Sequence, residues 1–343
     1  MRKIFLITLL SFSLTAAFAQ DGAVREMQKT AERGGAPADT IKDGWRKGGL
    51  FSLNLAQGGS RNWAAGAEKF SFSTNAFLNL FANHKRGRYS WDNSLDLSYA
   101  LVNTTSLGVR KTDDRIDFLS RYGYALNKKF DLSWIANFRS QFTDGFDYDY
   151  LGQKGNRRRI SGLFAPAYVT IAPGITWKPT NYFSIFVSPF SARWIIVSNA
   201  PYSYKYQGGI IPDSVSPGVE KPLANLYGVD AQRKVKFEFG AFASVNFNKE
   251  IIKNVYYKSR LDLYSNYLKT DRPGETFQPK KSRAKNVDVF WTNVVNMKVN
   301  KWLNVTYNFD LIYDDDVRQF GPTNTSAATQ LRSLLGVGFA AKF

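Results

Sequence analysis

Residues Leu334-Leu335-Gly336-Val337-Gly338-Phe339-Ala340-Ala341-Lys342-Phe343 end the chain. From Leu335 onward every second residue, counted back from Phe343, is apolar, and the residues between them are small or charged. Successive side chains of a strand point to opposite faces, so this segment has one apolar face and one small or polar face. A final amphipathic strand with a terminal aromatic residue is typical of bacterial outer-membrane barrels. The segment therefore predicts a transmembrane β-barrel.

The beginning of the chain predicts export. Met1-Arg2-Lys3 is basic, residues 4–17 are apolar, and Ala17-Phe18-Ala19 fits a signal-peptidase site, which together are typical of a secretory signal peptide. We expect residues 1–19 to be cleaved, so that the mature chain begins at Gln20. The absence of cysteine excludes a lipoprotein anchor, disulfides and thiolate metal sites.

Composition and charge agree with an exported barrel. The chain is 44% hydrophobic with a mean hydropathy of −0.32, as expected when only alternate strand residues face lipid. Loss of Arg2 and Lys3 with the signal lowers the formal net charge from +18 to +16. A basic chain often binds nucleic acid, but for an exported one we expect no nucleic acid and instead contacts with outer-membrane lipid and lipopolysaccharide.

Twelve amphipathic segments follow Gly48, and each is long enough for a tilted strand to cross a bilayer. Strands of soluble proteins more often stop at about five or six residues. A charge on the lipid face would cost ~2–4 kcal/mol at the bilayer midplane, and the apolar face of 300–313 carries none. The segments are 49–58, 68–82, 89–102, 114–127, 129–142, 164–177, 181–194, 234–248, 253–267, 285–299, 300–313 and 330–343.

Short and long connections alternate between these segments. Outer-membrane barrels have short periplasmic turns and long external loops, so we expect both ends of the chain in the periplasm. A soluble β-sandwich also alternates apolar and polar residues, but it does not explain this rhythm. The predicted short turns are 84–88, 127–128, 179–180, 248–250 and 299–300, and the predicted long loops are 59–67, 103–113, 143–163, 195–233, 268–284 and 314–329.

The predicted fold is therefore all-β, an antiparallel transmembrane β-barrel of about 12 strands over residues 48–343. Residues 20–47 include a short charged stretch followed by Gly34, Gly35 and Pro37. We interpret them as an N-terminal periplasmic extension or a small plug, with the extension favoured.

The start of the predicted barrel resembles a known family. Residues Trp45-Arg46-Lys47-Gly48-Gly49-Leu50-Phe51-Ser52-Leu53-Asn54-Leu55-Ala56-Gln57, then Asn62-Trp63-Ala64-Ala65-Gly66 and Tyr89-Ser90-Trp91-Asp92-Asn93, are similar to an outer-membrane family of the Bacteroidota known as a domain of unknown function of the 3078 type. The resemblance implies a barrel in a diderm envelope. It implies no activity, substrate or catalytic residue.

The sequence offers little for catalysis. Barrel phospholipases and proteases use a histidine as base or orienter, and the only histidine, His84, lies in a predicted turn. We predict that the protein is not an enzyme, with no catalytic residues and no cofactor. Asp144, Asp147 and Asp149 could bind Ca²⁺, but Arg157-Arg158-Arg159 follows in the same loop and ion pairing with these arginines is favoured. We predict no metal site there or at Asp314-Asp315-Asp316.

The predicted inward faces carry charges of both signs. A barrel of about twelve strands is narrower than an open porin, so these side chains either line a polar permeation path or pair across the lumen and close it. The aromatic residues Phe186, Phe190, Phe242 and Phe290, also predicted to point inward, favour closure. The predicted lumen charges are Asp92, Asp96, Asp117, Arg121, Asp131, Arg139, Lys236, Glu238, Lys258, Arg260, Asp262 and Asp310.

Two further segments point to partners. Loop 195–233 is rich in aromatic, aliphatic and proline residues, which suits either a self-packed lid or a surface for envelope protein partners. Phe339 and Phe343 form the predicted C-terminal signal read by the barrel-assembly machinery. We expect the outer membrane as location and a narrow or gated channel for small polar solutes as function. The alternative is a closed barrel that serves as scaffold or accessory subunit of a secretion, assembly or uptake complex.

Overall fold

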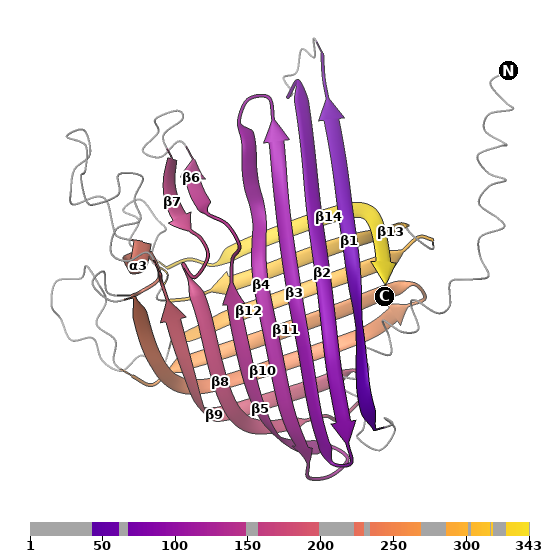
Figure 1. Cartoon of the computed structure of the whole chain (residues 1–343), viewed down its shortest axis with the longest axis vertical. Coiled ribbons are helices and arrows are strands. Elements are labelled where there is room, and N and C mark those ends of the chain that lie inside the picture. Colours follow the sequence, from indigo (N-terminus) through magenta and orange to yellow (C-terminus); the bar gives the residue numbers. More distant parts are fainter. Residues whose placement is uncertain are drawn as a thin grey trace, which may run out of the picture.

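The computed structural model describes residues 43–61, 68–148, 157–198, 223–229, 234–268, 286–300, 303–315, 317 and 327–342. Within them, twelve antiparallel strands close into one barrel (Figure 1), which confirms the predicted fold. The barrel strands are β1 (Gly44–Gly59), β2 (Phe70–Arg86), β3 (Tyr89–Thr104), β4 (Gly108–Ala125), β5 (Phe130–Ser140), β8 (Ala167–Trp177), β9 (Phe183–Ile196), β10 (Val235–Ile252), β11 (Val255–Asn266), β12 (Val287–Lys298), β13 (Leu303–Tyr313) and β14 (Gln330–Lys342).

Among the described residues, three smaller elements lie outside the barrel wall. Strands β6 (Gly145–Tyr148) and β7 (Arg157–Ser161) form a separate hairpin between β5 and β8. A single helical turn, α3 (Leu223–Leu226), lies between β9 and β10. No helix in the described part of the chain is long and apolar enough to cross a membrane.

The first and last strands close the barrel. In their antiparallel pairing Leu53 lies opposite Phe339 and Asn54 lies opposite Gly338. Strand β1 begins at Gly44, ahead of the expected barrel start at Gly48. The predicted signal peptide and Phe343 lie outside the described residues.

The connections β2–β3, β4–β5, β8–β9, β10–β11 and β12–β13 lie at one end of the barrel, which we call the short-turn end. The opposite end is the long-loop end. The structure corrects one predicted long loop, 103–113, because β3 and β4 continue to a turn of only Thr105-Ser106-Leu107. Gly108 takes the positive φ of +67° that this turn needs, a conformation that suits glycine. The backbone N–H of Leu107 donates to Oγ1 of Thr104 at 3.2 Å.

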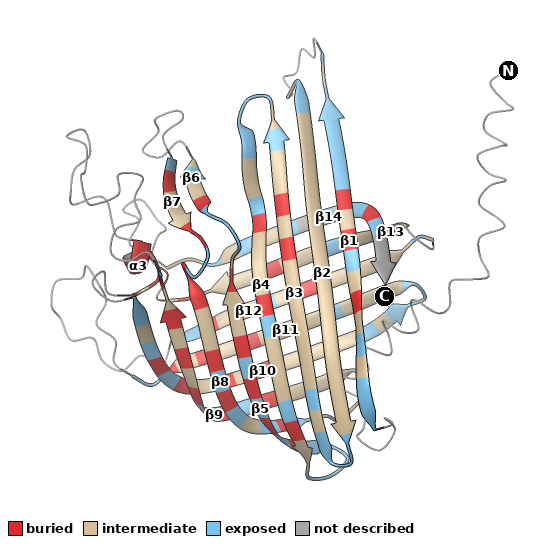
Figure 2. Ribbon diagram, in the orientation of Figure 1, coloured by how far each residue is buried: buried red, intermediate tan, exposed pale blue. Residues whose placement is uncertain are grey.

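The barrel has two walls whose strands cross. Figure 1 shows β1 to β4 in front running steeply across β10 to β14 behind them. Along β5 buried and exposed residues alternate strictly over its first eight positions. On β8 and β9 Figure 2 shows buried residues separated by intermediate and exposed ones, with less regular spacing. Alternation places one set of side chains in the lumen and the other on the outer surface.

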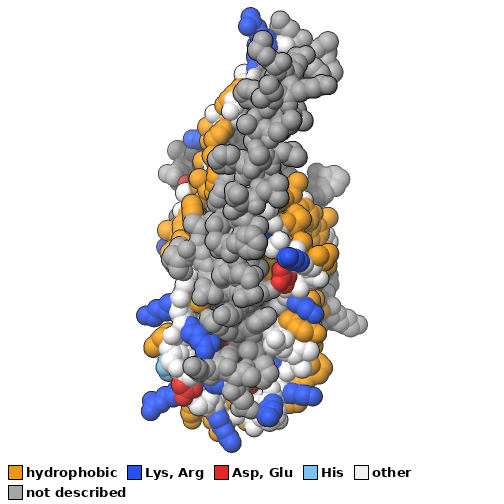
Figure 3. Space-filling view, turned by 90° about the vertical axis from the view of Figure 1, so that its right-hand side faces the viewer, with side chains coloured by type: hydrophobic (Ala, Val, Ile, Leu, Met, Phe, Trp, Pro, Cys, Tyr) orange, Lys and Arg blue, Asp and Glu red, His pale blue; other side chains and the backbone are white. Residues whose placement is uncertain are grey.

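The outer surface is apolar. On β14, Leu331, Leu335, Val337 and Phe339 are 65%, 70%, 52% and 55% exposed, and Figure 3 shows hydrophobic side chains along both flanks of the molecule. Monomeric soluble proteins rarely expose contiguous apolar surface of this extent. The outer surface is therefore suited to a lipid environment.

Aromatic rings gather on this surface near the short-turn end. Trp45 lies 5.8 Å from Trp91 and Tyr89 lies 5.1 Å from Tyr124, measured between ring centroids. Rings of this kind are enriched where a membrane protein meets the lipid headgroups. The single histidine, His84, lies within β2 and not in a solvated turn, and its ring centroid is 4.9 Å from that of Trp45, with the two rings tilted.

A bulge in β9 changes which residues face inward. Gly240 pairs with Ser191 but Phe242 pairs with Ser188, so two residues of β9, Pro189 and Phe190, oppose the single Ala241 of β10, and β9 carries one extra residue. The bulge places Phe190 on the outer surface, 61% exposed and stacked on Phe239. The prediction that Phe190 points inward is therefore wrong, because a bulge interrupts the period of two.

Candidate functional site

Ion pairs cross the lumen and connect strands that are not neighbours. The Arg139 guanidinium on β5 contacts Asp117 on the adjacent β4, with Nε 3.0 Å from Oδ2. Its Nη2 also lies 2.6 Å from Oδ2 of Asp262 on β11. In the ring β5 and β11 are separated by β8, β9 and β10. Arg139 therefore ties two walls of the barrel together.

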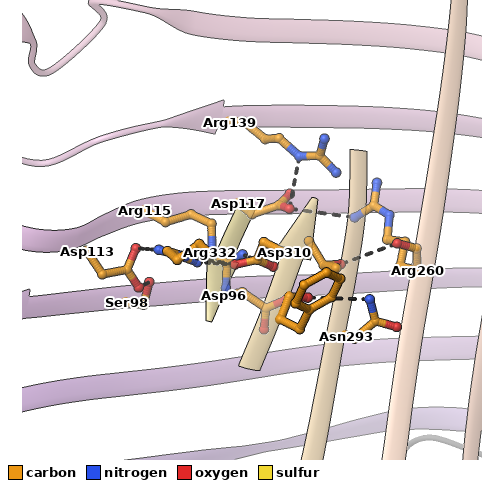
Figure 4. Close-up of polar contacts among 12 residues, drawn as sticks. Asp96, Ser98, Asp113, Arg115, Asp117, Arg139, Arg260, Asn293, Asp310 and Arg332 are labelled. Atoms are coloured by element: carbon orange, nitrogen blue, oxygen red, sulfur yellow. Dashed lines mark hydrogen bonds and ion pairs between the residues drawn. The ribbon is translucent and has the colours of Figure 1, made fainter. Parts of the chain in front are cut away.

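Arg260 on β11 completes this cluster. Its Nη2 lies 2.9 Å from Oδ2 of Asp262 on its own strand, and its Nη1 lies 3.7 Å from Oδ2 of Asp117 across the lumen. Figure 4 shows Asp117 between the two guanidinium groups, Arg139 and Arg260. We call Asp117, Arg139, Arg260 and Asp262 the cross-lumen cluster. All four belong to the predicted set of lumen charges, and the structure brings them together.

Further cross-lumen pairs flank this cluster. Arg332 on β14 pairs with Asp310 on the adjacent β13 and with Asp113 on β4, and Ser98 donates to Asp113 (Figure 4). Arg115 on β4 lies 3.8 Å from Asp310. Strands β4 and β14 are separated in the ring by β3, β2 and β1. The pairs therefore span the lumen in a second direction.

Several members of this network are absent from the predicted set of lumen charges. Arg115 lies two residues before Asp117 on β4 and therefore points to the same face. Arg332 lies between apolar, outward-facing residues of β14. The alternation along each strand was therefore sufficient to predict that both arginines point into the lumen. Asp113 was missed because it fell in the predicted loop 103–113. Arg193 follows the β9 bulge, which no sequence pattern revealed.

Arg193 is the centre of a buried charged group. Its guanidinium lies 2.6 Å from Oε2 of Glu238 and 2.5 Å from Oδ2 of Asp288. Lys236 lies 2.8 Å from the other oxygen of Glu238. Arg193 also stacks over the Tyr264 ring at 3.9 Å. Glu238 is fully buried, so this group fills part of the lumen instead of lining an open path.

The remaining predicted charges lie nearer the short-turn end. Arg121 on β4 lies 2.5 Å from Asp92 on β3 and 3.8 Å from Asp131 on β5. Lys178, in the turn after β8, pairs with Asp131. Burial and the nearby Arg121 charge lower the pKa of Lys178 to about 8, because both disfavour a second positive charge there.

Asp96 on β3 makes no strong ion pair across the lumen. It accepts a hydrogen bond of 2.6 Å from Asn79 on the neighbouring β2. Lys258 on β11 lies 3.8 Å away, but its side chain is 47% exposed. An exposed, long pair of this kind contributes at most about 1 kcal/mol, so it does not hold the walls together.

A cavity of about 350 Å³, lined by amide, hydroxyl and charged groups among aromatic and aliphatic side chains, occupies the short-turn half of the lumen. Ligand pockets have volumes of roughly 300–1,000 Å³, so the cavity has room for a small solute. Its lining includes Arg115, Asp117 and Arg260, so the cross-lumen cluster closes it on the side of the long loops. It shares Asn83, Asp92 and Arg121 with a smaller cavity that reaches the β2–β3 turn.

An apolar cluster lies at the long-loop end. Helix α3 contributes Leu223, Ala224 and Leu226, which pack with Ile195 and Val197 at the C-terminal end of β9. Tyr227 donates to the backbone carbonyl of Ile160 at 2.7 Å. The described part of loop 195–233 is thus packed on the barrel itself, while residues 199–222 and 230–233 lie outside the described residues.

Among the described acidic loop residues, Asp144 pairs with an arginine, and Asp315 accepts a hydrogen bond of 2.7 Å from the amide of Asn286. Asp144 lies 2.7 Å from Arg159, and Asp147 lies opposite Arg158 in the β6–β7 hairpin. Asp149 and Asp316 lie outside the described residues. Phe339 of the predicted assembly signal is exposed on the outer face of β14.

The fold and lumen define a class: a closed twelve-stranded barrel with an apolar exterior and a charged, partly filled interior. Residues 55–146 match the model of a family described as protein of unknown function (DUF3078). This match confirms, over that part of the chain, the predicted resemblance to a domain-of-unknown-function family. The chain has no match among curated proteins.

Several solved barrels are similar in architecture. The NanC porin is 10% identical with a TM-score of 0.34, covering 84% of this chain and 98% of its own. An outer-membrane channel from Pseudomonas putida F1 is 9% identical with a TM-score of 0.39, covering 89% and 97%. The translocator domain of autotransporter NalP from Neisseria meningitidis is 9% identical with a TM-score of 0.32, covering 92% and 94%. These low scores decide nothing about function, and the barrel assignment rests on the strand pairing of this chain.

Proposed function

We propose that the chain is an integral outer-membrane barrel that acts as a gated channel for small polar solutes. The cavity that ends at the cross-lumen cluster, with amide, hydroxyl and paired charged groups in its lining, carries this proposal. A cavity lined by polar groups admits water and polar solutes from the short-turn end. The ion pairs beyond it form the gate.

The physical basis of the gate is that its ion pairs are held by side chains from different walls. Cross-lumen contacts such as Arg139 with Asp262 exclude solutes as long as they persist. A charged or strongly hydrogen-bonding solute competes for the same groups, and small movements of the walls separate the partners. The ion pairs thus block the lumen reversibly, because they can separate and form again.

The outer-membrane location is supported by the surface of the barrel. The apolar side chains of β14 and the aromatic rings near the short-turn end fit a hydrocarbon band with an interfacial girdle. The proposed role includes no catalytic step and no cofactor; the histidine His84 lies beside Trp45, with ring centroids 4.9 Å apart.

Conductance in planar bilayers tests the channel. We expect the purified barrel to give brief, infrequent openings of low conductance, since the described lumen is crossed by ion pairs. The control is a bilayer with detergent alone at the same concentration. A barrel that stays silent at every voltage the bilayer tolerates, including in the gate variant described in the Discussion, would contradict the proposal.

The alternative is a closed barrel that acts as scaffold or accessory subunit. The buried group around Arg193 favours this role, because it fills the lumen with paired charges. A scaffold predicts stable protein partners after extraction in mild detergent. A lone monodisperse barrel in a native pull-down would count against it.

A further inference from the structure

We infer that the cavity in the short-turn half binds a small uncharged polyhydroxy solute, of the size of a mono- or disaccharide. This inference rests on the proposed channel function and names its solute class. It is carried by three properties of the cavity: balanced charge, a lining rich in amides and aromatic rings, and buried polar atoms without a protein partner.

The charges that line the cavity cancel. Four acidic and four basic side chains of the described residues contribute to its wall, and most of them pair with each other, as Arg121 does with Asp92 and Arg260 with Asp117. A cavity with one excess sign of charge would select ions of the other sign. A balanced, internally paired lining gives neither cations nor anions an advantage.

Amide side chains supply most of the remaining hydrogen-bonding capacity. Nine asparagines of the described residues line the cavity, together with several serines and threonines. An amide both donates and accepts, as the hydroxyl groups of a polyol require. Aromatic residues from both walls, among them Phe77, Phe81, Tyr182 and Phe186, also line it. Their rings offer apolar faces to the C–H groups of a sugar ring.

Two buried polar atoms lie at the seam where β1 meets β14. Ser52 and Asn54 are only 4% and 8% exposed and line the cavity, yet Oγ of Ser52 and Oδ1 of Asn54 have no hydrogen-bond partner among the described residues. Buried polar atoms are nearly always hydrogen-bonded. Both atoms have almost no exposed area, so a solute hydroxyl or a water in the cavity becomes their partner after a small rotation of the side chain toward the lumen.

Gly338 leaves space for the Asn54 side chain at the seam. Asn54 on β1 and Asn304 on β13 both lie opposite Gly338 of β14. A Cβ atom at Gly338 would lie 2.3 Å from Oδ1 of Asn54 and 2.3 Å from the backbone oxygen of Leu53. Any side chain there would displace Asn54, so the glycine keeps the amide at the cavity wall.

Anions are the competing ligand class. Exposed basic residues surround the short-turn end, including Arg86, Arg88, Lys128, Lys129 and Lys249, and Figure 3 shows lysine and arginine side chains in the lower half of the molecule. They raise the local concentration of anions outside the cavity. None of these five residues lines the cavity itself, so they do not decide what binds inside.

Saturation-transfer NMR on the full barrel tests the inference. The barrel is held in a detergent without a sugar headgroup, and sucrose, glucose, L-glutamate and L-lysine are titrated separately. We expect saturable binding of at least one sugar in the millimolar range, and weaker or no binding of the two charged amino acids. Saturable binding of neither sugar, or tighter binding of glutamate or lysine, overturns the inference.

Two seam variants locate the binding. Asn54→Leu keeps the side-chain size and removes the amide, and we expect sugar affinity to fall about tenfold, as for the loss of a buried hydrogen-bonding group. Asn103→Leu is the matched control, because Asn103 is exposed on β3 and does not line the cavity, and it should bind as the wild type does. If Asn54→Leu fails to fold, Ser52→Ala replaces it. Unchanged affinity in the folded variant overturns the site.

The binding and conductance experiments test the solute class and the channel function independently. A barrel that binds sugar but never conducts contradicts the channel and keeps the binding site. A barrel that conducts but binds neither sugar keeps the channel and overturns the solute class.

Discussion

Removal of the cross-lumen cluster should raise the conductance of the barrel at least about tenfold, because the described gate consists of paired side chains rather than a folded plug. The variant combines Asp117→Asn, Arg139→Ala, Arg260→Ala and Asp262→Asn. Both signs of charge are removed together, since deleting one sign alone leaves buried charges without partners and destabilises the protein. Single-channel recording in planar bilayers measures the change.

The matched control for the gate is Lys258→Ala. Lys258 also lies on β11 and reaches across the lumen, but its contact with Asp96 is 3.8 Å long and its side chain is 47% exposed. Its removal should leave the conductance near that of the wild type. Both barrels must show the electrophoretic mobility of the folded state. Equal conductance of the wild type and the quadruple variant would then contradict a gate at the cross-lumen cluster.

Arg193→Met should lower the free energy of unfolding by about 3–5 kcal/mol, the usual effect of removing one partner of a buried ion pair. Arg193 is 4% exposed and holds two carboxylates, Glu238 and Asp288. Without the guanidinium these carboxylates lose their main counter-charge, although Lys236 still contacts Glu238. Reversible urea unfolding in detergent or lipid measures the loss.

Two further variants separate charge from packing at this position. Arg193→Met with Glu238→Gln and Asp288→Asn should recover part of the lost stability, since no buried charge then lacks its partner. Arg159→Met is the surface control: it removes the contact with the 49% exposed Asp144, and it should cost less than about 1 kcal/mol. A loss for Arg193→Met as small as for Arg159→Met would show that the buried group contributes nothing.

Strand periodicity revealed most of the fold. The chain alternates apolar and polar residues over segments of bilayer length, and the twelve predicted segments correspond to the twelve barrel strands. Alternation persists because lipid on one side and a polar lumen on the other impose it at every position. It failed at the β9 bulge, where Pro189 and Phe190 shift the register, and at the turn before Gly108, where a tight turn with a positive φ was interpreted as a loop.

The site could be predicted only in part, for a different reason. The alternation of side chains along each strand indicates which charges face the lumen. It correctly predicted that Asp117, Arg139, Arg260 and Asp262 point inward. It gives no information on which strands lie opposite one another, because that depends on ring order, tilt and flattening. The pairing of Arg139 with Asp262 on β11, and of Arg332 with Asp113 on β4, therefore emerged only from the structure.

Thiol accessibility from the two sides of the membrane tests the central claim most directly, namely that the cavity opens to the short-turn end and is closed from the long-loop end. The chain has no cysteine, so Ser94→Cys in the cavity and Ser106→Cys in the exposed β3–β4 turn each provide a single reactive group. Intact cells are treated with a membrane-impermeant maleimide, and the labelling is repeated after the outer membrane is opened. We predict prompt labelling of Ser106→Cys in intact cells, and labelling of Ser94→Cys only after opening. Equal labelling of both in intact cells would contradict a closed lumen, and labelling of neither until opening would contradict the proposed orientation.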